Sequence, residues 1–235
     1  MNTEVSICLP IYNEAKSIKF VLQEWTKSLE RLKVRYNIIC SEDGSNDGTK
    51  QILNSLSKKN KKIINNSSIF KRGYGKAVIS GIEKSKSKYI VCIDSDGQCD
   101  PGDFLKFWKK RNQNSKFIII GNRTNRKDGY FRNFISFIFK IFHKILFKHN
   151  VTDPSCPYIL FQRKHFNLLK KKLVFMKEGF WWGFIAIASQ KNFSIKEVKI
   201  NHRYRIYGKT NVYKLHKIPS IAFRNAFGLI KIKIT

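Results

Sequence analysis

Two aspartates follow a run of apolar residues near the middle of the chain, in the segment Asp94-Ser95-Asp96-Gly97-Gln98. The preceding run, Tyr89–Ile93, is typical of a buried strand, and residues two apart in an extended chain project to the same side. Asp94, Asp96 and Gln98 would then offer two carboxylates and an amide oxygen, the hard ligands that Mg²⁺ and Mn²⁺ prefer. An ordinary turn is the alternative, because Asp-Gly is a common turn dipeptide. The position at a strand end favours a metal site.

Two further loops carry residues that could bind a ligand. Residues 9–14 end one predicted strand and open a helix, and the acidic, glycine-rich residues 41–49 follow another strand. Carboxylates in the second loop could accept hydrogen bonds from a nucleobase or a ribose, and the glycines permit close approach. Helix capping explains Asn46 and Asp47 equally well, but it does not explain Asp43.

A basic cluster lies near the end of the chain, in Arg203-Tyr204-Arg205-Ile206-Tyr207-Gly208-Lys209-Thr210. The segment has too much charge and too little periodicity for a core element, and its glycine favours a loop that closes over a ligand. In an extended chain Arg203 and Arg205 would face the same way as one cationic clamp for phosphate groups, and Lys209 would add a third charge. A solvated basic loop is the alternative.

Short apolar runs alternate with helical patterns through the first half of the chain. We predict strands at residues 5–9, 37–40, 63–64, 89–93 and 117–120, and helices at 14–31, from about 47, at 76–84 and near 104–108. This alternation implies right-handed crossovers and a mostly parallel sheet flanked by helices. Ligands in such α/β sheets bind outside the carboxyl ends of the strands. The three loops at residues 9–14, 41–49 and 94–98 follow such ends.

The second half contains an unusual helical pattern at Phe131–Phe147. Phenylalanine and isoleucine give it a wide apolar face, and polar residues that include Lys140, His143 and Lys144 recur every three or four positions. A helix of this kind can lie in a membrane interface, although a core helix packed on the sheet is the alternative. The mixed segment Ile221–Ile232 also favours peripheral contact with an anionic membrane. We expect no membrane span, because no stretch is long and apolar enough.

Composition limits the other possibilities. A chain of 235 residues with 42% hydrophobic residues suits one α/β domain. The formal net charge of +30 favours phosphate-bearing ligands or an anionic membrane. Nucleic acid is not an expected partner, because the acidic loops would repel its backbone. Five cysteines without metal or redox spacing, and no visible signal peptide, predict a cytoplasmic protein that contacts the membrane peripherally.

Six motifs follow one another along almost the whole chain. They are Pro10-Ile11-Tyr12-Asn13-Glu14, Asp43-Gly44-Ser45-Asn46-Asp47-Gly48-Thr49, Gly73-Tyr74-Gly75-Lys76-Ala77, Asp94-Ser95-Asp96-Gly97-Gln98, Gly121-Asn122-Arg123 and His202-Arg203-Tyr204-Arg205-Ile206-Tyr207-Gly208-Lys209-Thr210. In this order they resemble the family-2 glycosyltransferases, and more closely the polyprenyl-phosphate branch that includes dolichol-phosphate mannose synthase. One such motif is weak evidence, whereas six in order are highly specific.

The resemblance implies a GT-A fold, an α/β architecture with a Rossmann-like sheet. It divides a single domain, residues 1–235, into a nucleotide-sugar half at 1–125, an acceptor half at 126–215 and a tail at 216–235. The residues implied to bind the donor are Pro10, Tyr12, Glu14, Asp43, Asp94, Arg123, Arg203 and Lys209, with Asp94, Asp96 and Gln98 as the metal and diphosphate site. Arg123 and Arg205 would contact the diphosphate or the acceptor phosphate, and Asp153 matches an acid that relatives place near the acceptor.

The chain also departs from the family's pattern. Asn211 stands where mannose synthases usually carry Lys, which weakens mannose as the donor sugar. Gly183 and Ile187 stand where relatives often carry Glu and Arg. The second departure removes an ion pair, and it motivates the alternative hypothesis of an inactive scaffold.

We therefore expect an inverting enzyme that uses Mg²⁺ or Mn²⁺ to transfer a sugar from a GDP- or UDP-linked donor to a polyprenyl or dolichyl phosphate. Asp96 and Arg205 would act on the leaving diphosphate, and Asp153 is the candidate base. A lipid phosphate is mostly a dianion at neutral pH, so it needs cationic positioning more than deprotonation. A sugar hydroxyl in polysaccharide or lipid-linked glycan synthesis would need a base, and it is the alternative acceptor.

Overall fold

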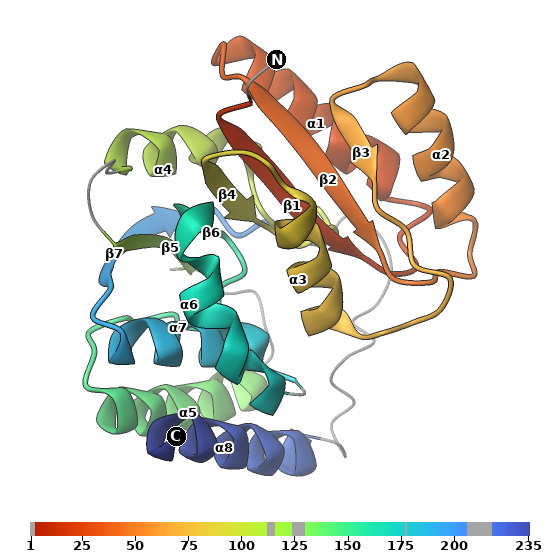
Figure 1. Cartoon of the computed structure of the whole chain (residues 1–235). Coiled ribbons are helices and arrows are strands. Elements are labelled where there is room, and N and C mark those ends of the chain that lie inside the picture. Colours follow the sequence, from red (N-terminus) through yellow and green to blue (C-terminus); the bar gives the residue numbers. More distant parts are fainter. Residues whose placement is uncertain (1–2, 112–115, 124–129, 177, 206–217) are drawn as a thin grey trace.

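The computed structural model describes residues 3–111, 116–123, 130–176, 178–205 and 218–235. In these residues the core is a seven-stranded sheet with the order β3-β2-β1-β4-β6-β5-β7 (Figure 1). The strands are β1 (Val5–Ile11), β2 (Tyr36–Glu42), β3 (Ile63–Asn65), β4 (Tyr89–Cys92), β5 (Phe117–Arg123), β6 (Ile159–Gln162) and β7 (Ser194–Ile200).

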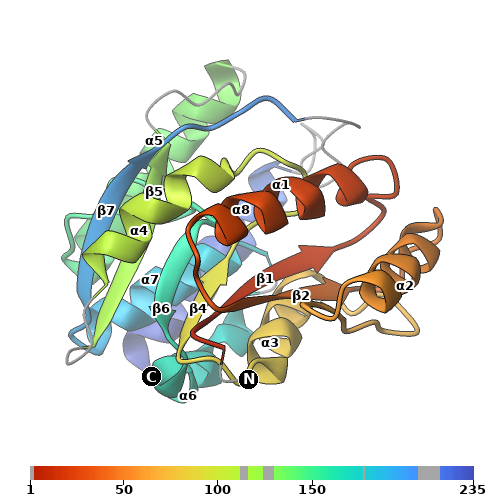
Figure 2. The ribbon, with the colours of Figure 1, turned by 90° about the horizontal axis from the view of Figure 1, so that it is seen from above.

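Helices connect the strands and cover the sheet. They are α1 (Ile18–Arg31), α2 (Thr49–Lys59), α3 (Tyr74–Lys84), α4 (Phe104–Lys110), α5 (Tyr130–Phe147), α6 (Phe166–Lys170), α7 (Phe180–Gln190) and α8 (Ile218–Ile234), with short 3₁₀ helices at Pro101–Asp103, Arg163–His165 and Lys171–Phe175. Helices α1 and α4 lie on one face of the sheet, and α3, α6 and α7 lie on the other (Figures 1 and 2). Helices α5 and α8 pack on α7 as an outer layer.

The sheet is mostly parallel, as predicted. Strand β6 is the exception, because it runs antiparallel to both β4 and β5 between which it lies. The sequence pattern did not predict β6 or β7. The carboxyl ends of β1, β2, β4, β5 and β7 therefore meet the start of β6 at one edge of the sheet. That edge collects loops from both halves of the chain.

The predicted core face of α1 is confirmed, because Ile18, Val21, Leu22, Trp25 and Leu29 are all buried. The helix begins four residues later than predicted. The carbonyl of Glu14 accepts hydrogen bonds from the N–H groups of Ser17 and Ile18, so residues 14–17 form a separate turn. The side chain of Glu14 is thereby left at the sheet edge rather than on the helix.

Helix α5 agrees with the predicted segment, but His143 does not lie on its solvent-facing polar stripe. Its side chain is fully buried, with Nε2 2.9 Å from the carbonyl oxygen of Trp182 and Nδ1 2.6 Å from Nε2 of His149. Burial lowers the pKa of His143 to about 3, so the ring is neutral. It belongs to the packing of α5 on α7. Within the described residues, no helix combines the length and apolarity needed to cross a membrane.

Candidate active site

The loops after β1 and β2 are joined by hydrogen bonds at the sheet edge. The N–H of Glu14 donates to Oγ1 of Thr49 at 2.9 Å, and the N–H of Ala15 donates to Oδ2 of Asp47 at 3.0 Å. Oδ1 of Asp47 accepts from the N–H of Thr49 at 3.1 Å, in the first turn of α2. The N-cap of α2 is Gly48 and not Asp47 as the capping interpretation expected, and Asp47 instead ties the start of α2 to the turn that carries Glu14.

Asp43 holds the loop that precedes α3. Its two carboxylate oxygens accept from the N–H groups of Arg72 and Gly73 at 2.9 and 2.8 Å, and its side chain is buried. Gly44 has a φ of +71°, and a Cβ there would lie 2.5 Å from the carbonyl carbon of Phe70. The loop therefore packs tightly against the end of β2. Asp43 thus fixes the loop that would form one wall of the predicted nucleotide site.

Tyr12 and Pro10 lie at the end of β1 in the same region. The ammonium group of Lys71 lies over the ring of Tyr12, 3.7 Å from its centroid. The carbonyl oxygen of Pro10 accepts from the hydroxyl of Ser95 at 2.9 Å. This bond attaches the aspartate loop after β4 to the neighbouring strand.

Asp94 and Asp96 form a partly buried carboxylate pair on that loop. Oδ1 of Asp94 accepts from the hydroxyl of Tyr74 at 2.7 Å, and Oδ1 of Asp96 accepts from the N–H of Gln98 at 3.0 Å. Burial, and next the charge of Asp96, raise the pKa of Asp94 to about 7. Burial also raises the pKa of Asp96. Two carboxylates are thus held close together, and a bound cation would offset the repulsion between their negative charges.

These residues fit a divalent cation. Carboxylates are the hard oxygen donors that Mg²⁺ and Mn²⁺ take, and the charge of Asp96 is, after burial, the second cause that raises the pKa of Asp94. The side-chain nitrogen of Gln98 donates to the carbonyl of Arg203 at 3.2 Å, so its oxygen is the atom through which it would bind a cation. In the part of the chain that the structure describes, no three His, Cys, Asp or Glu side chains are grouped to hold a metal.

Two arginines lie at this edge. The guanidinium of Arg205 forms an ion pair with Glu14, and its Nη1 lies 3.9 Å from Oδ2 of Asp96. Arg123, at the end of β5, donates from Nε and Nη2 to the two oxygens of Asp153 at 2.6 and 2.9 Å. Asp153 is 1% exposed. Its carboxylate is a buried, bidentate partner of an arginine, rather than an acid open to the site.

Arg203 and Arg205 form ion pairs with different carboxylates, whereas alternation in an extended chain predicts a single clamp. The guanidinium of Arg203 pairs with Glu24 of α1 at 3.0 Å and with Asp100 at 2.6 Å. Residues 98–99 and 202–203 are bridged by backbone hydrogen bonds, which direct the two arginines to different carboxylates. Lys209, the other predicted cation, lies outside the described residues.

Sequence reasoning missed the residues that support this site from a distance. Oε1 of Glu197, on β7, accepts from the N–H groups of Thr152 and Asp153 at 2.9 and 3.2 Å. In the sequence Tyr74 is only one member of a motif, although its hydroxyl contacts Asp94. Neither contact has a local sequence signal, because the partners are 20 to 45 residues apart.

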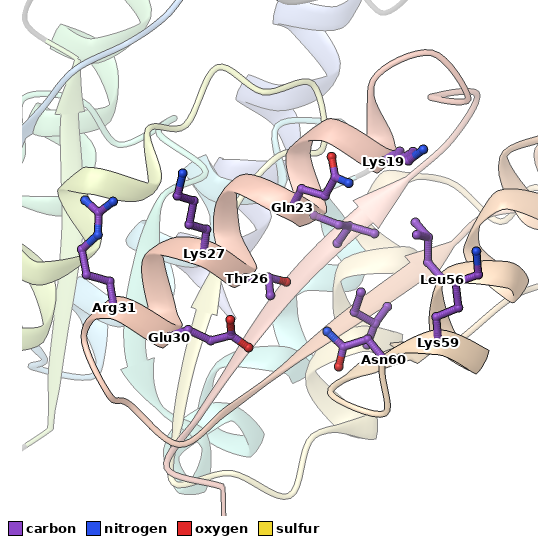
Figure 3. Close-up of a pocket in the computed structure, with 11 residues that line it drawn as sticks. Lys19, Gln23, Thr26, Lys27, Glu30, Arg31, Leu56, Lys59 and Asn60 are labelled. Carbon is purple, nitrogen blue, oxygen red and sulfur yellow. The ribbon is translucent and has the colours of Figure 1, made fainter.

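A separate groove lies on the other side of the sheet's first strands, away from these residues. The groove lies between α1 and α2 and has a volume of about 450 Å³, and it is lined by residues such as Leu56, Lys27 and Glu30 (Figure 3). None of the predicted site residues lines it. The sheet edge, where carboxylates and arginines converge, is therefore the candidate active site.

Comparison with known proteins identifies the family. The family model described as Glycosyl transferase family 2 matches residues 6–169, which include both carboxylates of the pair. The chain belongs to glycosyl transferase family 2. It is therefore a glycosyltransferase, as its motifs predicted.

Curated relatives of this glycosyltransferase act on different sugars. Dolichyl-phosphate beta-glucosyltransferase of Dictyostelium discoideum is 28% identical over 99% of this chain and 78% of the relative. Undecaprenyl-phosphate 4-deoxy-4-formamido-L-arabinose transferase of Aeromonas hydrophila is 24% identical over 91% of this chain. The match spans 64% of that second relative's length.

Solved structures confirm the GT-A fold. Glucosyl-3-phosphoglycerate synthase from Mycobacterium tuberculosis, crystallised with Mn²⁺, UDP and phosphoglyceric acid, has a TM-score of 0.72 at 14% identity, over 98% of this chain and 78% of that one. Mannosyl-3-phosphoglycerate synthase from Rubrobacter xylanophilus has a TM-score of 0.68 at 13% identity, over 97% of this chain and 73% of that one.

Packing explains why Gly183 and Ile187 of α7 depart from the family's pattern. A Cβ at Gly183 would overlap Met176 and lie 3.4 Å from Ile232 of α8, and Ile187 is buried. Small and apolar residues at these positions let α7 and α8 approach closely.

Proposed function

We propose that this glycosyltransferase transfers a sugar from a nucleoside diphosphate to a polyprenyl phosphate, with inversion, at a membrane surface. The observation that carries the proposal is the state of Asp153. Both of its carboxylate oxygens accept from Arg123 in a buried pair, which stabilises the charged carboxylate and opposes its use as a proton acceptor. The site thus offers cations to an anionic acceptor, and a phosphate acceptor needs no base.

The donor half of the site suits departure of a diphosphate. A divalent cation bound by Asp94, Asp96 and Gln98 would act as a Lewis acid on the diphosphate oxygens. Arg205, 3.9 Å from Asp96, lies where it could exchange its contact with Glu14 for the diphosphate. Its planar fork meets two phosphate oxygens at once and stabilises the charge that develops as the glycosidic bond breaks. Tyr12 and Asp43 would contact the nucleoside.

The acceptor half suits a phosphate. Arg123 is oriented by Asp153 and donates also to Oγ of Ser155 at 2.7 Å. Glu197 fixes the turn that carries Asp153, so the arginine is supported by a chain of hydrogen bonds. An arginine held in this way attracts a dianionic acceptor and directs one of its oxygens toward the anomeric carbon. A single displacement of that kind inverts the anomeric configuration.

The names of the relatives support the same acceptor class. One relative is named for dolichyl phosphate and another for undecaprenyl phosphate, although their sugars differ. The shared element is a long-chain lipid phosphate, which resides in a membrane. We therefore propose this acceptor and leave the sugar and the base of the donor unspecified.

The outer helices would provide the membrane contact. Helix α5 exposes Phe137, Ile138, Ile141 and Ile145, and helix α8, which packs against it, exposes Phe223, Phe227, Ile230 and Ile234. Large apolar side chains in such numbers on adjoining helices are typical of a surface that meets another apolar phase. The net charge of +30 favours anionic lipid headgroups around them.

Transfer to polyprenyl phosphate is the decisive assay. Purified protein is incubated with Mn²⁺ and a panel of radiolabelled GDP- and UDP-sugars, with either polyprenyl phosphate or an oligosaccharide as acceptor. We expect label in the lipid phosphate with at least one donor, and loss of transfer when EDTA is added. Transfer to the oligosaccharide alone would show a hydroxyl acceptor, and EDTA-resistant transfer would contradict the metal site.

Flotation with anionic liposomes tests the membrane surface separately. The variants Ile145→Asp and Phe223→Asp place a charge on the exposed faces of α5 and α8, and they should shift the protein from the liposome fraction to the soluble fraction. Phe20→Asp is the matched control, because Phe20 is exposed on α1, on the other face of the sheet. Equal loss of flotation in all three variants would contradict a surface confined to the outer helices.

A further inference from the structure

Tyr74 connects the aspartate pair to α7. Its hydroxyl donates to Oδ1 of Asp94 at 2.7 Å, and the indole Nε1 of Trp181 lies 2.7 Å from the same phenolic oxygen. The ring of Tyr74 packs edge-on against Phe180, with centroids 6.4 Å apart. Residues 74, 94 and 181 thus belong to three separate elements that meet at one oxygen atom.

The chemistry of these groups determines the direction of each hydrogen bond. An indole N–H can only donate, so Trp181 must donate to the oxygen of Tyr74. The phenol has one proton, and with its oxygen accepting from Trp181 that proton is directed to Asp94. The bond therefore favours the ionised carboxylate, and it holds Oδ1 in place while Oδ2 remains for a cation.

Close packing makes the arrangement rigid. A Cβ at Gly75 would lie 3.0 Å from Cδ2 of Phe180, so glycine at this position lets the start of α3 approach α7. Trp181 and Phe180 are both buried, whereas Tyr74 is 42% exposed and reaches the site with its hydroxyl end. The tyrosine is thus anchored by its neighbours, and only its hydroxyl contacts Asp94.

We infer that Tyr74, oriented by Trp181, is a positioning residue that holds Asp94 ready for the divalent cation. The inference rests on the metal site of the proposed function and adds two residues to it. Groups that orient a metal ligand from behind typically change metal affinity by about 10- to 100-fold when they are removed. The effect should therefore fall on cation binding rather than on the acceptor.

Mn²⁺ binding by the purified protein tests this directly. Free Mn²⁺ is measured by electron paramagnetic resonance, with UDP absent and present, for the wild type and for Tyr74→Phe, Trp181→Phe and the double variant. We expect the Kd for Mn²⁺ to rise roughly tenfold or more in Tyr74→Phe. Trp181→Phe should cause a smaller rise, and it should add nothing once the hydroxyl is gone, because the tryptophan acts through that hydroxyl.

A control and a rescue separate positioning from a loss of structure. Tyr36→Phe removes a hydroxyl that donates to Glu30 at 3.2 Å, far from the sheet edge, and it should leave the Kd unchanged. Transfer by Tyr74→Phe should recover at high Mn²⁺ concentration, which a misfolded site would not allow. Wild-type affinity in a folded Tyr74→Phe would overturn the inference while leaving the metal site intact. Additive effects of the two substitutions would overturn the role of Trp181, and a wild type that binds no Mn²⁺ would overturn both the metal site and this inference.

Discussion

Replacing Arg205 is the sharpest test of the site, because the structure separates this arginine from its neighbour Arg203. Arg205 contacts Glu14 and lies 3.9 Å from Asp96, whereas Arg203 pairs with Glu24 and Asp100. Both residues carry the same charge and stand two positions apart. If Arg205 stabilises the leaving diphosphate, its loss should slow transfer far more than the loss of Arg203.

The size of the effect follows from the interaction expected between Arg205 and a diphosphate held at a similar distance. Two unit charges about 4 Å apart near a protein surface interact by about 4 kcal/mol at an effective dielectric constant of about 20. Removal of one preorganised donor to a developing anion typically costs about 2–4 kcal/mol, which corresponds to a rate about 30- to 1,000-fold lower. Arg205→Lys keeps the charge but loses the planar fork, so we expect an intermediate loss of about tenfold.

Transfer is measured at saturating donor and Mn²⁺ for Arg205→Ala, Arg205→Lys and Arg203→Ala, and unfolding temperatures are recorded for each variant. Arg203→Ala should lower the rate by no more than about fivefold, because a partly exposed ion pair contributes at most about 1 kcal/mol. Near-normal rates for both Arg205 variants would refute the role of this arginine. Equal losses for Arg203 and Arg205 would refute their separation.

Three other predictions concern the residues at the same edge of the sheet and the reaction proposed there. The pKa of Asp94 is raised to about 7, so protons compete with the metal below that pH. Mn²⁺ should therefore raise the Tm more at pH 8 than at pH 6. An increase in Tm at pH 6 that equals or exceeds the increase at pH 8 would contradict this. Asp153→Asn breaks the buried pair with Arg123 at a cost of about 3–5 kcal/mol, and should lower the Tm by about 6–20 °C. If transfer were abolished while the Tm stayed unchanged, the result would instead indicate that Asp153 acts as a base. Nuclear magnetic resonance of the product should show a β linkage from an α-linked donor, and an α linkage would exclude inversion.

Local sequence patterns predicted the donor half of the fold well. The apolar run before Asp94 and the periodicity of α1 each depend on residues close in the chain, so alternation and helical spacing were sufficient to place them. The motifs then predicted the family. The same reasoning failed for His143, because the pattern of α5 shows which residues are polar but not which side of the helix packs on α7.

The sequence by itself determined which residue types could do the chemistry: two carboxylates after a buried strand, arginines near the end of the chain, and a parallel sheet that presents them at one edge. The tertiary structure alone decided their partners. Because β6 enters antiparallel between β4 and β5, the turn that precedes it brings Asp153 to Arg123. The same assembly directs Arg203 and Arg205 to different acids and places the hydroxyl of Tyr74 between Asp94 and Trp181. Such contacts join residues 20 to 191 positions apart, and no local periodicity reports which distant side chains will meet.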